Sequence, residues 1–138
     1  MSTEKLDWGQ ISAFSEPKLS PGFTLWHDFM RWQRELNARL RPLKLTQPQF
    51  AVLAVCAWLS REGHEVTQHA IVDFLGMDRM HISQIASRLE QNGLIERKMA
   101  TTDMRAKHVS LTEKGRKLLA QAMPVVEEFD RAFFRNSA

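Results

Sequence analysis

Two short helical segments separated by only three residues restrict the fold of this chain more than any other feature. Thr67 is placed to cap a helix over residues 68–75, which Gly76 can end in the left-handed conformation. Asp78 is placed to cap a second helix that begins at residue 79. Helices joined by a turn as short as Gly76-Met77-Asp78 form a helix-turn-helix.

A β-hairpin is predicted directly behind the second helix. Asn92-Gly93 suits the end of that helix, and two strand-like runs with interspersed charges follow at residues 94–99 and 106–111. The polar stretch 100–105 joins them as a long tip. A helix-turn-helix followed by a hairpin is a winged helix, so we expect a mainly α fold with a small β-hairpin wing, in the α+β class.

Longer helices are predicted on both sides of this unit. Ser20-Pro21 is typical of a helix start and Pro42 of a stop, so one helix should run from residue 21 to about residue 41. Residues 1–20 have weak periodicity and read as an arm with one short turn at most. A last helix should begin behind Thr112, and Pro124 is expected to kink or split it.

The helix between these two is predicted to lie at the centre of the core. Thr46-Gln47-Pro48-Gln49 is a capping box, in which Thr46 caps the helix and Gln49 reaches back to it. The helix behind the box runs to about Ser60 and is apolar nearly all round, which is typical of a buried helix. Gly63 should end it.

Composition limits the class of protein. The chain has 138 residues, enough for one domain, and a net charge of +3. Residues 78–117 carry nine basic and five acidic groups, the strongest local excess, so a nucleic-acid partner is sought there. The first ten residues resemble no signal peptide and the longest apolar run has ten residues, so we expect a cytoplasmic protein without a membrane segment.

The second helix of the helix-turn-helix has one face for the core and one for DNA. Ile82, Ile85, Ala86 and Leu89 form the predicted core face. Arginine can bind guanine, glutamine can bind adenine, and serine can accept or donate to several base edges. No acidic residue lies between Arg79 and Arg88, as binding to a phosphate-lined groove requires. The predicted outer face is made of Arg79, Met80, His81, Ser83, Gln84, Ser87 and Arg88.

Five stretches of sequence resemble the MarR family of bacterial transcription regulators, in its shorter subgroup. They are L-T-Q-P-Q-F-A-V-L at 45–53, T-Q-H-A at 67–70, R-L-E-Q-N-G-L-I-E-R at 88–97, D-M-R-A-K at 103–107 and V-S-L-T-E-K-G at 109–115. The resemblance implies a homodimeric winged helix-turn-helix that represses transcription on a pseudo-palindromic DNA site. It also implies release by a small aromatic effector or by oxidation.

The resemblance assigns roles to the wing and divides the chain. Asp103-x-Arg105 matches the wing-tip signature, in which the arginine reaches the minor groove or backbone and the aspartate holds it. Arg97 matches a basic position on the wing strand, and the expected DNA contacts of the wing are Arg97, Asp103 and Arg105. The single domain, residues 1–138, then consists of the arm 1–20, dimerisation helices 21–45 and 113–135, and the winged helix-turn-helix 46–112.

The flanking helices carry apolar stripes whose use is left open. Trp26, Phe29 and Leu36 on one helix, and Val125, Phe129 and Phe133 on the other, suit a core and a dimer seam better than a ligand cage. In the resembling family, ligands bind between the first helices and the DNA-binding lobe. The candidate ligand residues are therefore Trp26, His27, Met30 and Trp32.

Other classes of function find less support. The alternative is a winged-helix module that binds protein and not DNA. Acidic residues on the outer face or loss of the wing arginine would favour it, and the sequence shows neither. A small metal- or ligand-binding protein lacks a site, because the five histidines show no ligand spacing and His64-Glu65-x-x-x-His69 has one residue too many for a zinc hydrolase. No catalytic motif and no cofactor site is found. Cys56, in an apolar helix, is expected to be a buried, inert thiol.

Overall fold

The computed structural model describes residues 4–99 and 107–135. The chain divides into two compact units, Met1–Glu35 and Leu36–Ala138. The first unit contains a short helix α1 (Trp8–Ile11), a 3-10 turn (Pro17–Leu19) and most of helix α2 (Pro21–Leu40). The segment expected to hold one short turn at most thus contains two. Helix α2 ends one residue before the predicted end, where a 3-10 turn (Arg41–Leu43) contains Pro42.

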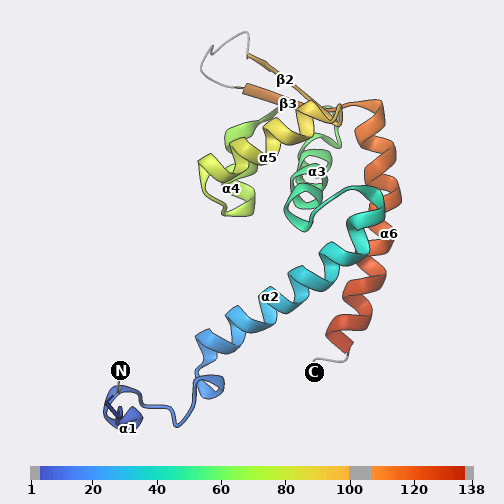
Figure 1. Ribbon diagram of the computed structural model, residues 1–138. Helices are drawn as coiled ribbons and strands as arrows, with labels where there is room; N and C mark the ends of the chain where they lie inside the picture. The colour runs from blue at the N-terminus through green and yellow to red at the C-terminus, as the bar shows by residue number, and fades with distance from the viewer. Residues whose placement is uncertain (1–3, 100–106, 136–138) are drawn as a thin grey trace. The chain divides into compact units, whose positions relative to one another are not determined.

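The second unit is built around helix α3 (Gln47–Ser60), as predicted. The capping box is present, because the Thr46 hydroxyl accepts from the Gln49 amide and the Gln49 side chain accepts from the Thr46 amide. Helix α3 lies between the pair α4 and α5 on one side and α6 on the other (Figure 1). Its fully buried side chains include Val52, Leu53 and Cys56. Helix α3 therefore forms the base on which α4 and α5 pack.

The helix-turn-helix consists of α4 (Gln68–Leu75) and α5 (Arg79–Gln91). The Thr67 hydroxyl accepts from the Ala70 amide, and an Asp78 carboxylate oxygen accepts from the Met80 amide. Gly76 has a φ of +68°, the left-handed conformation that ends α4. All of these caps were predicted from the sequence. They fix the start of α5, which begins only four residues after α4 ends.

Helix α5 ends in a Schellman motif that turns the chain into the wing. Gly93 has a φ of +74° and donates to the Glu90 carbonyl, while the Leu94 amide donates to the Leu89 carbonyl. Leu94 is buried and supplies the hydrophobic contact that accompanies this motif. The strand that follows is therefore held close to the last turn of α5.

The wing is a three-stranded antiparallel sheet in the order β1-β3-β2. Strands β2 (Ile95–Met99) and β3 (Lys107–Leu111) form the predicted hairpin, with Arg97 opposite Val109. The tip predicted at residues 100–105 lies outside the described residues. Strand β1 (Val66–Thr67) pairs with the other edge of β3 and was not predicted, because two residues are too few to show an alternating pattern.

Helix α6 (Glu113–Arg135) closes the second unit. The Thr112 hydroxyl accepts from the Gly115 amide, so the predicted cap is present. Pro124 was expected to kink or split this helix, and the split is wrong, since α6 is continuous through it. Pro124 and Ala120 are both exposed, so water can bind the Ala120 carbonyl that has lost its usual amide donor.

Candidate nucleic-acid interface

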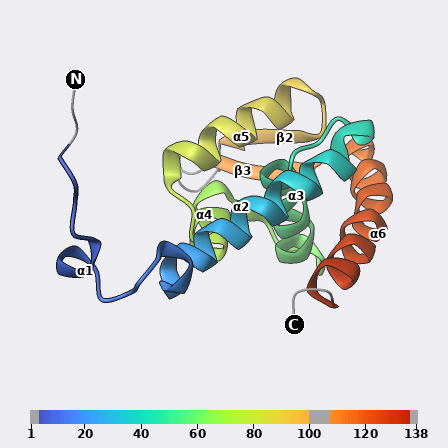
Figure 2. The ribbon, with the colours of Figure 1, turned by 60° about the horizontal axis from the view of Figure 1, so that its bottom comes forward.

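Helix α5 has the two faces that its sequence predicts. Ile82, Ile85, Ala86 and Leu89 are all buried against the rest of the second unit. The residues on the opposite side are exposed or half-buried, and Met80 is 69% exposed. Figure 2 shows α5 lying along the β2–β3 hairpin, and α5 contacts β2. The exposed members are Arg79, Met80, His81, Gln84 and Arg88, and the half-buried ones are Ser83 and Ser87.

The open face of α5 is cationic. Arg79 and Arg88 are exposed, and no carboxylate lies between them on the helix. Asp78 lies at the N-terminus and is used as the cap. The next acid, Glu90, accepts hydrogen bonds from Arg97, and these bonds hold the pKa of Glu90 below its ordinary value. The face therefore presents positive charge and hydrogen-bonding groups without an unpaired acid.

Arg97 lies on the wing but its side chain is turned into the fold. Only 12% of the side chain is exposed, and its guanidinium donates to Glu90, Gln68 and Ser87. The sequence singled out Arg97 and Ser87 as DNA contacts, and here they bind each other. Gln68 and Glu90 were not singled out, because nothing in the sequence says that they meet across three elements.

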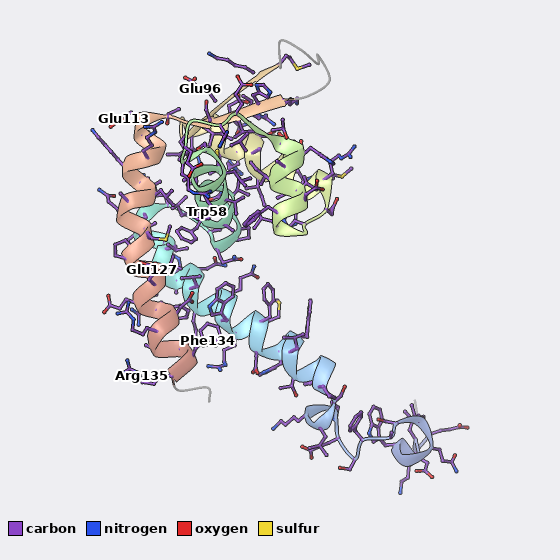
Figure 3. All side chains as sticks on the ribbon, turned by 180° about the vertical axis from the view of Figure 1, so that it is seen from behind. Trp58, Glu96, Glu113, Glu127, Phe134 and Arg135 are labelled. Carbon is purple, nitrogen blue, oxygen red and sulfur yellow. The ribbon has the colours of Figure 1, made fainter. Side chains whose placement is uncertain are left out.

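Other cations of the wing are exposed. Lys98 and Lys107 lie near the described ends of the hairpin, and both are open to solvent. Sequence reasoning did not name them, although the charge in both strands was the signal. Glu96, labelled in Figure 3, is an exposed acidic residue on β2. The predicted wing-tip residues Asp103 and Arg105 lie outside the described residues.

The candidate ligand residues on α2 are only partly brought together. Trp26 and Met30 are exposed and Trp32 is half-buried and in contact with the Phe29 ring. His27 stacks on Phe23 and lines a cavity of about 570 Å³ within the first unit. The other lining residues are Glu16, Pro17, Lys18, Phe23 and Thr24, so His27 alone of the four candidates reaches this cavity.

Cys56 is a buried thiol. Its side chain has no exposed surface, and its thiol donates to the Val109 carbonyl at 3.7 Å. Burial raises the pKa of Cys56 to about 11, so the thiol is almost wholly protonated at neutral pH.

Neither a metal centre nor a membrane segment is found in the part of the chain that the structure describes. Within residues 4–99 and 107–135, no group of three His, Cys, Asp or Glu side chains could hold a metal ion. In the same ranges, every helix is too short or too polar to cross a bilayer.

The helix-turn-helix, its cationic open face and the adjoining wing define a winged helix-turn-helix DNA-binding protein. Residues 43–127 match the family described as ArnR1-like, winged-helix domain. The HTH-type transcriptional regulator YdcH of Bacillus subtilis (strain 168) is 39% identical over 123 residues, which cover 89% of this chain and 84% of YdcH. The transcriptional regulator HosA of Escherichia coli O157:H7 is 33% identical over 103 residues, or 75% of this chain and 69% of HosA.

A solved structure of a transcriptional regulator has the same fold. The crystal structure of a MarR variant from Escherichia coli, complexed with operator DNA, superposes with a TM-score of 0.74. It is 25% identical and covers 83% of this chain and 80% of that one. The chain therefore belongs to the MarR family of winged helix-turn-helix transcriptional regulators, a family of regulators and not of enzymes.

Proposed function

We propose that this chain is a homodimeric repressor that binds a pseudo-palindromic operator. Each subunit places α5 in a major groove and its wing beside the adjacent minor groove. The observation that carries the proposal is the outer face of α5, which is exposed, cationic and free of acid from Arg79 to Arg88. That face suits a surface lined by phosphates better than it suits another protein.

Base recognition is assigned to the side chains with the greatest freedom on this face. Arg79, Gln84 and Arg88 are exposed and carry the groups that bind guanine and adenine edges. His81 is exposed beside them, and Met80 offers an apolar contact. Asp103 and Arg105 are assigned to the wing tip on their sequence signature. These side chains should set the operator sequence, while lysines add sequence-independent affinity.

A gel shift with a salt titration tests DNA binding. About 6–10 phosphates neutralised by two subunits predict that log K falls against log salt with a slope near −5 to −9. The probe is a duplex that the wild-type protein selects from a random library. Gln84→Ala should relax the preference at particular base pairs, whereas Lys98→Ala should weaken all sequences equally. A flat salt response would exclude the proposal.

The homodimer is proposed because the first unit has no core of its own. None of residues 4–35 is buried, and ten of the fifteen large apolar side chains exposed in the described part of the chain lie there. Trp26, for example, is 63% exposed. Exposed apolar surface of this extent marks a partner surface. A second copy of the same chain, packed on residues 21–45 and 113–135 about a two-fold axis, would bury it.

Part of the two apolar stripes is core within one chain, which is one of the two uses expected for them. Phe129 and Phe133 are 6% and 8% exposed within one chain, and Leu36 is fully buried, so these residues already belong to a core. Trp26 and Phe29 on α2 are the exposed members of the stripes. Phe134, which was not part of them, is also exposed at the end of α6 (Figure 3). A charge at position 129 would damage the fold of the subunit itself.

Trp26→Asp is therefore the better test of the dimer. We expect the wild type to be a dimer, with an interface of about 2,000 Å² or more, and the variant to be a folded monomer. Light scattering measures the mass of each, and circular dichroism shows whether the variant is folded. Gln91→Asp, an exposed change outside residues 21–45 and 113–135, is the control. A monomeric wild type that binds its operator fully would contradict the proposal.

Release by a small aromatic effector is the last part of the proposal. The cavity around His27 has an aromatic wall, Phe23, and a cation, Lys18, which suit an aromatic carboxylate. A panel of hydroxybenzoates should include one that releases DNA from the wild type, and Lys18→Ala should resist release. Lys44→Ala, outside the cavity, should behave as the wild type. Operator binding unaffected by the whole panel would remove the effector from the proposal.

A further inference from the structure

Arg97 connects the wing to both helices of the helix-turn-helix. From strand β2, its Nε and Nη2 donate to Glu90 Oε1 at 3.2 and 3.0 Å. Nη1 donates to Gln68 Oε1 at 3.2 Å, and Nη2 also donates to Ser87 Oγ at 3.0 Å. Gln68 is the first residue of α4, while Ser87 and Glu90 lie on α5. One guanidinium therefore holds three elements whose relative placement decides how the protein meets DNA.

These bonds use most of the capacity of the guanidinium. A guanidinium has five N–H donors, and the four bonds engage four of them. The backbone amide of Arg97 donates to the second carboxylate oxygen, Glu90 Oε2, at 3.2 Å. Glu90 thus accepts from both the side chain and the main chain of one residue. Such a geometry depends on a planar fork and cannot be reproduced by a lysine.

The burial of Arg97 follows from its place in the strand. Ile95 is buried, and side chains two apart in a strand share a face, so Arg97 lies on the covered side of β2. Its cross-strand partner is Val109, which is also buried. Lys98 lies on the opposite face and is exposed. Reaching a phosphate would require Arg97 to leave all of its partners.

We propose that Arg97 is a positioning residue, which fixes the angle between the recognition helix α5 and the wing and does not itself contact DNA. This inference rests on the operator binding proposed above. The proposal also gives Glu90 a role, which is to hold Arg97 in place. Glu90 lies at the edge of a DNA-binding face, and through Arg97 it should favour specific binding. A carboxylate there would otherwise repel phosphate.

The test compares Arg97→Met, Arg97→Lys and Glu90→Gln with Lys98→Met, a matched loss of an exposed cation from the same strand. Affinities are measured by fluorescence anisotropy at about 25 °C for the selected operator duplex and for a shuffled duplex of equal composition. Positioning predicts that Arg97→Met weakens operator binding about tenfold or more, the size of one lost base contact. Binding to the shuffled duplex and the salt slope should change little.

The competing explanations give different patterns. A phosphate contact at Arg97 predicts equal weakening on both duplexes, a salt slope reduced by about 0.9 per contact, and rescue by lysine. Under that explanation Glu90→Gln would strengthen binding, because it frees the arginine and removes a negative charge. Positioning predicts the opposite sign for Glu90→Gln and no rescue by lysine. A purely structural role predicts a lower melting temperature with both affinities retained while the protein is folded.

Hydrogen exchange without DNA separates this inference from the proposed function. Arg97→Met should speed exchange of the amides in β2 and in the last turn of α5, and Lys98→Met should not. If the wild type selects no DNA sequence, the operator proposal fails while exchange still decides whether Arg97 holds the wing. Unchanged exchange in Arg97→Met would overturn the inference.

Discussion

Gly115→Ala should destabilise this protein although alanine is the better helix former. Gly115 is the third residue of α6, and it is buried against the chain at the start of the wing. A Cβ built there would overlap the Leu94 carbonyl oxygen and lie 3.0 Å from the carbonyl carbon. Because the obstacle is backbone, relief requires α6 or the segment before β2 to move. Leu94 O also accepts from the Thr112 amide, which restricts that movement.

The magnitude follows from two opposing effects. Replacing glycine by alanine within a helix contributes about 1 kcal/mol of stability. Overpacking against rigid surroundings costs up to about 3 kcal/mol or more, so the free energy of unfolding should fall by about 2 kcal/mol. For a chain of this size that corresponds to a decrease of roughly 8 °C in melting temperature. Thermal unfolding followed by circular dichroism, at a fixed protein concentration, measures it.

Gly22→Ala is the matched control. Gly22 is the second residue of α2, and a Cβ there meets no atom of the chain within 4 Å. Only the helix propensity remains, so this variant should be as stable as the wild type or more stable by up to about 1 kcal/mol. A Gly115→Ala variant at least as stable as the wild type would refute the reasoning from close approach.

Three further results are expected. Thr46→Ala should lower the free energy of unfolding by about 1 kcal/mol in urea denaturation, because the capping box of α3 is lost, whereas Thr24→Ala, within α2, should cost less. Iodoacetamide at about pH 8 should modify Cys56 far more slowly in the native protein than in urea, and equal rates would contradict its burial. The pKa of Glu90 is lowered by its hydrogen bond from Arg97, so the stabilisation it provides is present above about pH 4.5 and is lost as the pH falls through the lower folded value. The stability gap between wild type and Glu90→Gln, measured by urea unfolding, should therefore narrow only below about pH 4.5.

The parts of the fold that sequence predicts are those set by local chemistry. Each cap at Thr46, Thr67 and Asp78 depends on atoms within three residues, and all three are present. The core face of α5 depends on helical periodicity alone, and it is buried as expected. Local geometry of this kind is visible in a sequence because the residues that interact are also neighbours in the chain.

Long-range packing could be predicted from the sequence only in part. Two stripes on the flanking helices look equally apolar in the sequence, yet Phe129 and Phe133 are buried in one chain while Trp26 is exposed. The difference comes from tertiary packing, which periodicity does not report. Strand β1 was missed for a similar reason, since its only sign is pairing with a strand more than forty residues away.

Arg97 lies between these two cases. The strand alternation that buries Ile95 already places Arg97 on the covered face of β2 and Lys98 on the open face, so the sequence contained the sign that their roles differ. What it did not contain was the partner. Glu90 lies seven residues earlier, and only the left-handed turn at Gly93 brings the end of α5 alongside β2. A basic residue on a DNA-binding wing can neutralise phosphate or fix the frame that does so. The face of the strand on which it lies decides between the two roles, and strand alternation alone predicts that face.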